Sequence, residues 1–82
     1  MKCDKFVYLD NKTLYFANTL REWRNFRGLT QQQLADLVGC SRNTISSIET
    51  GQFNPTAFTA GLICSVLNVP FEKVFHIVIC ED

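Results

Sequence analysis

Short apolar segments with helical periodicity, separated by residues that end helices, constrain this chain more than any other feature. From Ala17 onward each such segment is two or three turns long. Gly28, Gly39 and Gly51 follow three of them and Asn68 follows a fourth. The pattern predicts a small helical domain. At 82 residues, 46% of them hydrophobic and 20% charged, the chain suffices for one compact core and not for two.

Capping residues and periodicity together predict five helices. Thr30 and Gln33 form a capping-box pair, and Ser41 and Thr56 are good N-caps. The helices are expected over residues 17–27, 30–38, 41–50, 56–67 and 71–74. Their inward faces are expected to hold Leu20, Trp23, Phe26, Leu34, Ala35, Leu37, Val38, Ile45, Ile48, Ala57, Ala60, Gly61, Cys64 and Leu67. The aromatic residues Trp23, Phe53, Phe58, Phe71 and Phe75 are expected in the core rather than around a ligand.

Both ends of the chain favour strands. Residues 75–80 are rich in β-branched side chains, and residues 5–9 and 13–16 flank a turn-like sequence at 10–12. Residues 13–16 could instead extend the first helix backward. The chain is therefore expected to be mostly α, with a strand-like extension over residues 1–16, a helical domain over 17–75 and a C-terminal strand over 76–82.

The third expected helix has an unusual outer face. Ile45 and Ile48 share one side of a helical wheel. The opposite side carries Arg42, Asn43, Ser46, Ser47 and Thr50. This side is polar but almost uncharged, whereas an ordinary surface helix favours long charged helix formers. Such side chains suit base edges in the major groove, although a solvated face would explain them equally well. Their position on the second of two helices joined by a glycine turn favours groove binding.

Several motifs share their spacing with a known family. They are Leu20–Arg24, Gly28–Gln31, Leu34–Ala35, Val38–Ser41, Thr44–Gly51 and Asn54–Thr56. Together they resemble the Cro/C1-type helix-turn-helix family, also called XRE-like regulators, over residues 17–75. The resemblance implies a five-helix, lambda-repressor-like DNA-binding domain of a dimeric transcriptional regulator. Residues 30–38 would then be the positioning helix and residues 41–50 the recognition helix.

The resemblance also assigns roles to single residues. The base-reading positions are Arg42, Asn43, Ser47 and, as a weaker match, Ser46. The phosphate-facing positions are Gln31, Ser41, Thr44, Gln52 and Asn54, the last two through backbone N–H groups. Phosphate contacts would set the register on the duplex, and the base-reading side chains would recognise its sequence.

Arg24 and Glu49 are expected to form a structural ion pair. Glu49 lies beside the inward Ile45 and Ile48, and Arg24 follows the inward Trp23. The resemblance implies that such a pair holds the first helix to the end of the recognition helix. The alternative is direct phosphate contact by Arg24.

The sequence favours neither catalysis nor a cofactor. The four cysteines lie far apart without a CxxC pair, so neither zinc nor thioredoxin-like chemistry is expected. His76 is the single histidine and is expected on a strand surface, and no nucleophile elbow or glycine-rich phosphate loop occurs. We therefore expect no enzymatic activity, no metal and no cofactor.

Hydropathy and charge limit the location and the partners of the chain. No apolar run is long enough to span a membrane, and the first residues lack the features of an export signal, so a cytoplasmic protein is expected. The formal net charge is zero. Because few cations lie between residues 19 and 56, affinity for random DNA should be low and its salt dependence shallow.

Two apolar surfaces need a partner. Phe58, Leu62 and Val66 form a second apolar row on the fourth helix. Either the aromatic N-terminal segment covers this row, or a second subunit does. That segment contains Phe6, Tyr8, Tyr15 and Phe16.

The C-terminal strand must also pair, since a lone strand is unstable. Pairing with its symmetry mate would give a homodimer, with Phe75, Ile77, Val78 and Ile79 as the dimerisation residues. The N-terminal hairpin is the alternative partner, and both could join one sheet. The sequence thus predicts a dimeric repressor or autoregulator that reads palindromic double-stranded DNA. A protein-interaction module on the same scaffold, such as an antitoxin or anti-regulator, is the alternative.

Overall fold

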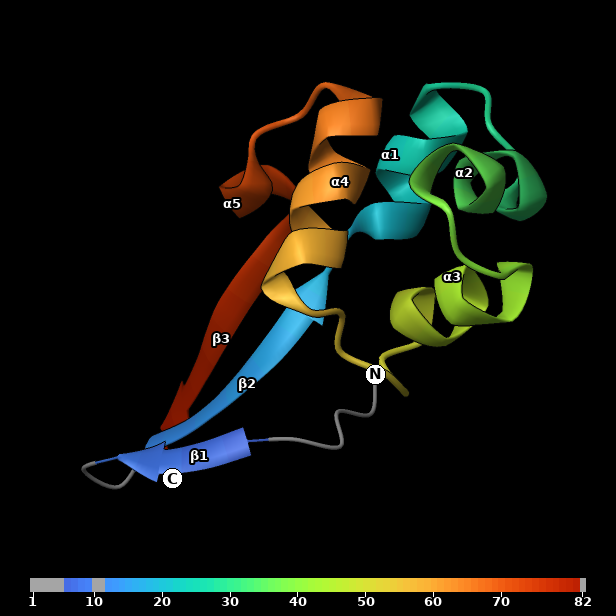
Figure 1. Ribbon diagram of the computed structural model, residues 1–82. Coiled ribbons are helices and arrows are strands. Elements are labelled where there is room, and N and C mark those ends of the chain that lie inside the picture. The colour runs from blue at the N-terminus through green and yellow to red at the C-terminus, as the bar shows by residue number, and fades with distance from the viewer. Residues whose placement is uncertain (1–5, 10–11, 82) are drawn as a thin grey trace.

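Five helices and a three-stranded sheet make up the part of the chain that the structure describes. The structure is a computed structural model that describes residues 6–9 and 12–81. The elements are β1 (Phe6–Leu9), β2 (Lys12–Asn18), α1 (Leu20–Phe26), α2 (Gln31–Val38), α3 (Arg42–Glu49), α4 (Ala57–Leu67), α5 (Phe71–Val74) and β3 (Phe75–Glu81). The helices form a body, and the sheet extends from it as a wing (Figure 1). This architecture confirms the expected mostly helical fold with strand-like ends.

The predicted capping residues begin three of the helices. The Thr30 hydroxyl accepts the Gln33 N–H at 3.0 Å, and the Gln33 side chain accepts the Thr30 N–H at 2.8 Å. Ser41 and Thr56 accept the amide three residues onward at 3.1 and 3.2 Å. Each cap satisfies an N–H group that the first helical turn leaves unpaired, which is why α2, α3 and α4 begin immediately after these residues.

A glycine turn sets the angle between α2 and α3. Gly39 has φ 87°, in the left-handed region, and its N–H donates to the Ala35 carbonyl at 2.8 Å. The next amide, that of Cys40, donates to the same carbonyl at 3.0 Å. A side chain at residue 39 would strain this backbone, so glycine permits α3 to follow α2 after a connection of only three residues.

The core lies among α1 to α5 and the base of the wing. It is formed by Leu20, Leu34, Ala35, Ile45, Ile48, Ala60, Ile63, Cys64, Leu67, Val69, Val74 and Phe75. On α4 the buried row is Ala60, Ile63, Cys64 and Leu67, so Ile63 occupies the place expected for Gly61. This row has the i, i+3, i+4, i+7 spacing of one helix face, and Gly61 lies outside it.

Several expected core residues are instead exposed. They are Phe26, Leu37, Phe53, Ala57, Phe58, Gly61 and Phe71. The buried residues of α2 are Leu34 and Ala35. Leu37 lies about 110° around the helix from the midpoint between them, outside the face that meets the core. Phe26 lies at the end of a helix that buries only Leu20 and Arg24. Hydrophobic character alone did not show which arc of each helix meets the body.

The sheet joins the two ends of the chain in the order β1, β2, β3, with both pairings antiparallel. Every residue of β2 pairs with β3, from Lys12 opposite Glu81 to Asn18 opposite Phe75. The first helix therefore begins at Leu20 and not at Ala17, because the backbone through Asn18 belongs to this ladder. Residues 13–16 are strand, and the N-terminal hairpin is the partner of the C-terminal strand. Residues 10 and 11 of the expected turn lie outside the described residues.

Aromatic stacking and hydrogen bonds hold the base of the wing to the helices. The ring of Phe75 stacks on Phe16 at 5.6 Å between centroids and lies 5.2 Å from that of Phe71. The Thr19 N–H donates to the Val74 carbonyl at 2.8 Å, and the Asn18 side-chain amide donates to the Ile48 carbonyl at 2.9 Å. The last contact ties the wing directly to α3.

Candidate nucleic-acid interface

Helix α3 separates a buried apolar face from an outward polar face. Ile45 and Ile48 are fully buried, whereas Arg42 and Asn43 are exposed. Ser46 and Ser47 are half-buried. Figure 1 shows α3 at the lower edge of the helical body. The apolar side anchors the helix, so the other side is free to meet a large partner.

An open hollow lies along the outward face of α3. It has a volume of about 210 Å³ and is lined by Asn43, Thr44, Ser47 and Phe53. The first three come from α3, and Phe53 comes from the segment that connects α3 to α4. The structure therefore brings together two expected base-reading residues, one expected phosphate contact and an aromatic ring that sequence analysis had placed in the core.

A buried carboxylate anchors the end of α3. The Glu49 side chain is completely buried and accepts from Arg24 Nε at 2.6 Å and from Arg24 Nη2 at 3.3 Å. Arg24 also donates to the Leu29 carbonyl at 2.8 Å. Burial by itself raises the pKa of Glu49, but the hydrogen bonds from Arg24 and Gln31 and the charge of Arg24 outweigh it, so the pKa is lowered. Arg24 thus joins α1 to α3 as a structural ion pair. Its side chain is buried, so it is not placed to contact a DNA phosphate.

Two further residues bind the same carboxylate, and sequence analysis missed both contacts. Arg21 Nε lies 3.3 Å from Glu49 Oε1, and Gln31 Nε2 donates to that oxygen at 3.1 Å. Because a carboxylate only accepts, the amide of Gln31 must turn its oxygen outward. That oxygen accepts from Arg42 Nη1 at 3.3 Å. A hydrogen-bonded chain therefore runs from the buried pair to an exposed residue at the start of α3.

The expected phosphate contacts divide into two groups. Ser41 and Thr44 share a hydroxyl hydrogen bond of 2.9 Å at the start of α3, and the Gln31 side chain contacts Arg42 of the same turn at 3.3 Å. The backbone N–H of Gln52, by contrast, donates to the Ser47 carbonyl at 2.9 Å, and that of Phe53 donates to the same carbonyl at 3.2 Å. The amide of Gln52 thus closes the end of α3, and a phosphate contact at Gln52 stays a prediction.

The comparison with known families decides the identity of the fold. The profile of the helix-turn-helix family matches residues 20–74, from the start of α1 to the end of α5. The chain belongs to the helix-turn-helix family. An uncharacterised HTH-type transcriptional regulator of Archaeoglobus fulgidus is 41% identical over 56 residues, which are 68% of this chain and 80% of that one.

Two relatives of this helix-turn-helix protein are named as control proteins. Control protein C.SmaI of Serratia marcescens is 33% identical over 67 residues, which are 82% of this chain and 79% of the relative. The crystal structure of the restriction-modification controller protein C.AhdI from Aeromonas hydrophila superposes with a TM-score of 0.63 at 31% identity. It covers 66% of this chain and 78% of C.AhdI. The protein is thus a DNA-binding transcriptional regulator, as the sequence predicted.

The strand expected to mediate dimerisation contributes side chains of two kinds. Phe75 is 2% exposed and packs in its own core, so it offers no surface to a second copy. Ile77 and Ile79 are 61% and 58% exposed, and Val78 is half-buried. Among the described strands, β2 is the only partner of β3, so the outer edge of β3 carries unpaired backbone groups.

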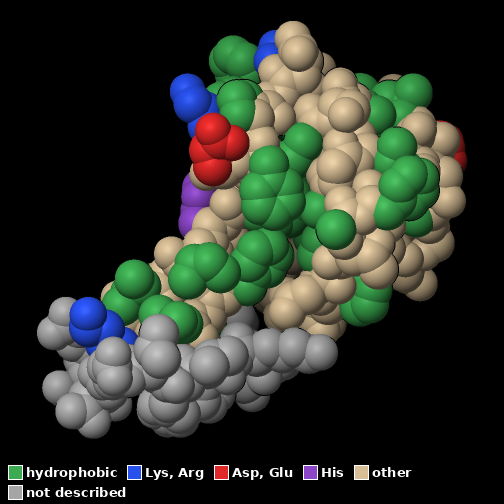
Figure 2. All heavy atoms as spheres, turned by 60° about the vertical axis from the view of Figure 1, so that its left-hand side comes forward, with side chains coloured by type: hydrophobic (Ala, Val, Ile, Leu, Met, Phe, Trp, Pro, Cys, Tyr) green, Lys and Arg blue, Asp and Glu red, His purple; other side chains and the backbone are tan. Residues whose placement is uncertain are grey.

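Hydrophobic side chains also gather on one face of the regulator. Figure 2 shows them along the wing and up onto the helical body. Phe58 is 75% exposed, while Leu62 and Val66 of the same row are half-buried. The side chains of Phe6 and Tyr8, which were candidates to cover the row, lie outside the described residues. Among the described residues, none covers the Phe58 end of this row, which is exposed to solvent.

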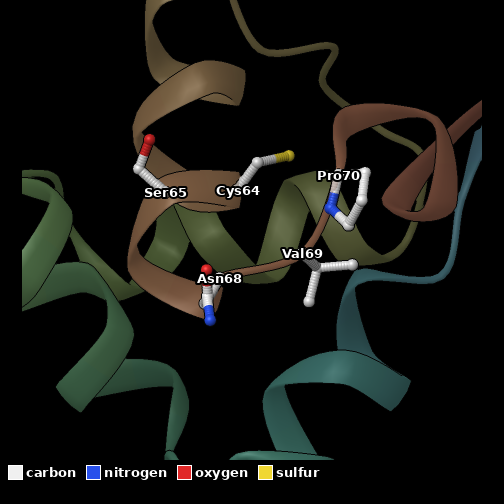
Figure 3. A pocket seen from close by; sticks show the side chains of 5 residues that line it. All are labelled: Cys64, Ser65, Asn68, Val69 and Pro70. Atoms are coloured by element: carbon white, nitrogen blue, oxygen red, sulfur yellow. The ribbon is translucent and has the colours of Figure 1, made fainter.

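A second hollow, of about 320 Å³, lies where α4 ends (Figure 3). It is lined by Cys64, Ser65, Asn68, Val69 and Pro70. Burial and the negative charge of Glu72 raise the pKa of the Cys64 thiol, so this thiol is a poor nucleophile or metal ligand. Within residues 6–9 and 12–81, no cluster of three metal-binding side chains occurs and no helix could cross a membrane.

Proposed function

We propose that this regulator is a sequence-specific repressor or autoregulator that places α3 in the major groove of double-stranded DNA. The observation that carries the proposal is the outward hydrogen-bonding face of α3, with Arg42 and Asn43 exposed opposite two buried isoleucines. Arg42 would donate to a guanine and Asn43 would pair with an adenine, with Ser46 and Ser47 beside them. We further infer a cytoplasmic protein without enzymatic activity.

Phosphate contacts would flank these base-reading side chains. The hydroxyls of Ser41 and Thr44 lie at the start of α3, where the helix dipole favours an anion, and the Gln31 side chain contacts Arg42 of the same turn. The side chains of Gln52 and Asn54 lie beyond its end. Contacts at both ends would set the register of the helix on the duplex.

The arginines near α3 support specific over unspecific binding. Arg21 and Arg24 bind Glu49, and Arg27 donates to the Leu67 carbonyl at 2.7 Å. Among the arginines of the described chain, Arg42 alone lies on the face proposed to read DNA. Its partner there is the uncharged side chain of Gln31, so its positive charge is not neutralised by an acidic residue. Few phosphates would be neutralised, so affinity should depend on matched bases and decline slowly with salt.

We also infer a homodimer formed through the free edge of β3. A two-fold axis perpendicular to the sheet relates the two copies of β3 as antiparallel strands and keeps every side chain on its own face. The axis must therefore pass midway between the two copies of one residue, which pair with each other. An axis at Val78 pairs all seven residues of β3 with the mate, and a shift to a neighbouring residue leaves two unpaired. This register sets Ile77 opposite the partner's Ile79, which matches two exposed aliphatic side chains.

Selection of bound sequences from randomised duplex DNA tests the DNA proposal. The expected result is a palindromic consensus with half-sites about one helical turn, roughly 34 Å, apart. Enrichment of no sequence would contradict it.

Cysteine cross-linking tests the dimer register. In a chain with its native cysteines replaced, Val78→Cys should give cross-linked dimers with a short thiol-reactive reagent, because the two thiols face each other across the axis. Lys73→Cys on α5 is the control and should not. Equal cross-linking of both variants would contradict the register.

A second candidate function is supported by the exposed apolar row. Phe58 is uncovered in the described chain, and such a surface suits a protein partner, as in an antitoxin or anti-regulator. Selection without enrichment, together with a dimer that leaves Phe58 accessible, would favour this function over direct DNA reading.

A further inference from the structure

Phe53 is an aromatic residue that the core does not explain. Its side chain is 49% exposed, although its size and apolar character would favour burial. It follows α3 and lines the hollow on the outward face of that helix. The other lining residues are all polar and all belong to α3. An apolar ring therefore stands beside the side chains proposed to meet DNA.

The backbone holds Phe53 in this place. The amides of Gln52 and Phe53 both donate to the Ser47 carbonyl, at 2.9 and 3.2 Å. These bonds turn the chain back along the last turn of α3 and keep residue 53 next to Ser47. The position of the ring is therefore built by the turn that ends the helix, and its approach to a partner would require no rearrangement.

The neighbours of the ring indicate what it would meet. Asn43 and Ser47 are proposed to read base edges, and Thr44 is proposed to meet a phosphate. A ring in the same hollow would lie between the base edges and the sugar-phosphate backbone. In the major groove the apolar group of the bases is the 5-methyl group of thymine, and it projects on the side of the base nearer its own backbone.

We infer that Phe53 is a specificity-determining residue whose ring contacts the 5-methyl group of one thymine in each half-site. The inference rests on the proposed function, since it requires α3 in the major groove. It assigns an apolar contact to a face otherwise composed of hydrogen-bonding groups. Hydrogen bonds would then select guanine and adenine, and Phe53 would add a preference for thymine over cytosine at its position.

Replacement of single thymines by deoxyuridine tests this contact, because it removes the methyl group and leaves the base-pairing and hydrogen-bonding groups in place. The probe is the duplex enriched from the randomised pool. Wild-type protein should lose about fourfold in affinity at one thymine of each half-site, as expected for one buried methyl group. Phe53→Ala should bind the thymine duplex more weakly and should not distinguish it from the deoxyuridine duplex.

Two variants separate this effect from a change in folding. Phe53→Leu keeps an apolar contact and should keep part of the discrimination between thymine and deoxyuridine. Phe58→Ala removes a more exposed aromatic ring outside the hollow and should keep the full discrimination. Thermal unfolding of each variant checks that the fold persists.

The outcomes distinguish this inference from the function on which it rests. A wild-type protein that binds the selected and scrambled duplexes equally would overturn the proposed function. Suppose instead that wild type prefers the selected duplex, but that wild type and Phe53→Ala lose the same factor in affinity at every thymine replaced by deoxyuridine. That result would overturn only the role of Phe53. Discrimination that disappears in Phe58→Ala as well would also overturn it.

Discussion

The helical body and the wing are specified by interactions of different range. In the body, a cap such as Thr30 or Ser41 acts on an amide three residues away, and Gly39 ends α2 through a bond to Ala35. In the wing, β2 pairs with a strand that lies more than fifty residues later in the chain. The difference teaches that local signals set the helix that would read DNA, while contacts between the chain ends create the edge proposed to join two copies.

The largest expected effect comes from the ion pair that holds the body together. Glu49→Ala leaves Arg24 buried without its partner, so the free energy of unfolding should fall by about 3–5 kcal/mol. Chemical denaturation measures it, with Glu22→Ala, an exposed acidic residue of α1, as the control. An unchanged unfolding midpoint would show that the body does not depend on this pair.

A smaller effect is expected on the outward face of α3. Arg42→Ala should cost about 1–3 kcal/mol of binding free energy on the selected duplex and should relax base choice at one position. The fold should persist, because Arg42 is exposed. Titration of selected and scrambled duplexes measures the difference, with Lys73→Ala as the control for lost charge. Equal losses on both duplexes would remove Arg42 from base reading.

The wing should affect assembly more than folding. Replacing Ile77 and Ile79 together by Asn should raise the dimer dissociation constant about tenfold or more, because both are exposed side chains of the proposed interface. The helical circular dichroism should be retained. Sedimentation measures the dimer, and a wild-type chain that stays monomeric at tens of micromolar would contradict the interface itself.

The smallest expected effect is on the pH dependence of stability. The pKa of Glu49 lies below its ordinary value of 4.5 in the folded protein, so the unfolded chain takes up its proton first on acidification. The stabilisation that the ionised Glu49 contributes should be complete above pH 4.5 and should decline as the pH falls through the lower pKa of the folded protein. Glu49→Gln should be less stable at neutral pH and should lack this part of the decline. Parallel acid-unfolding curves would contradict it.

The sequence predicted the order of the helices and strands because capping and helix-ending residues act locally. Gly39 and the Thr30–Gln33 capping box, for instance, mark the limits of α2 without reference to the rest of the fold. The start of α1 was expected too early, since the ladder with β3 extends β2 to Asn18. The exposure of Leu37 and Phe53 was missed for a similar reason, because an apolar residue carries no sign of which neighbour will cover it.

Within the candidate site, the sequence indicated the polar face of α3 and the pairing of Arg24 with Glu49. It did not indicate that Arg21 and Gln31 would bind the same carboxylate, or that Gln31 would pass that contact on to Arg42. Those contacts join three helices, and their donors have no spacing rule that links them along the chain.

Amino-acid order alone thus determined where α2, α3 and α4 begin and end and which side of α3 is apolar, because backbone capping and helical periodicity depend on residues within a few positions. Tertiary structure decided which apolar side chains are covered, how the buried carboxylate is shared and where the ring of Phe53 stands. These depend on packing between segments distant in the sequence, and many arrangements of the same helices would satisfy the local rules equally well.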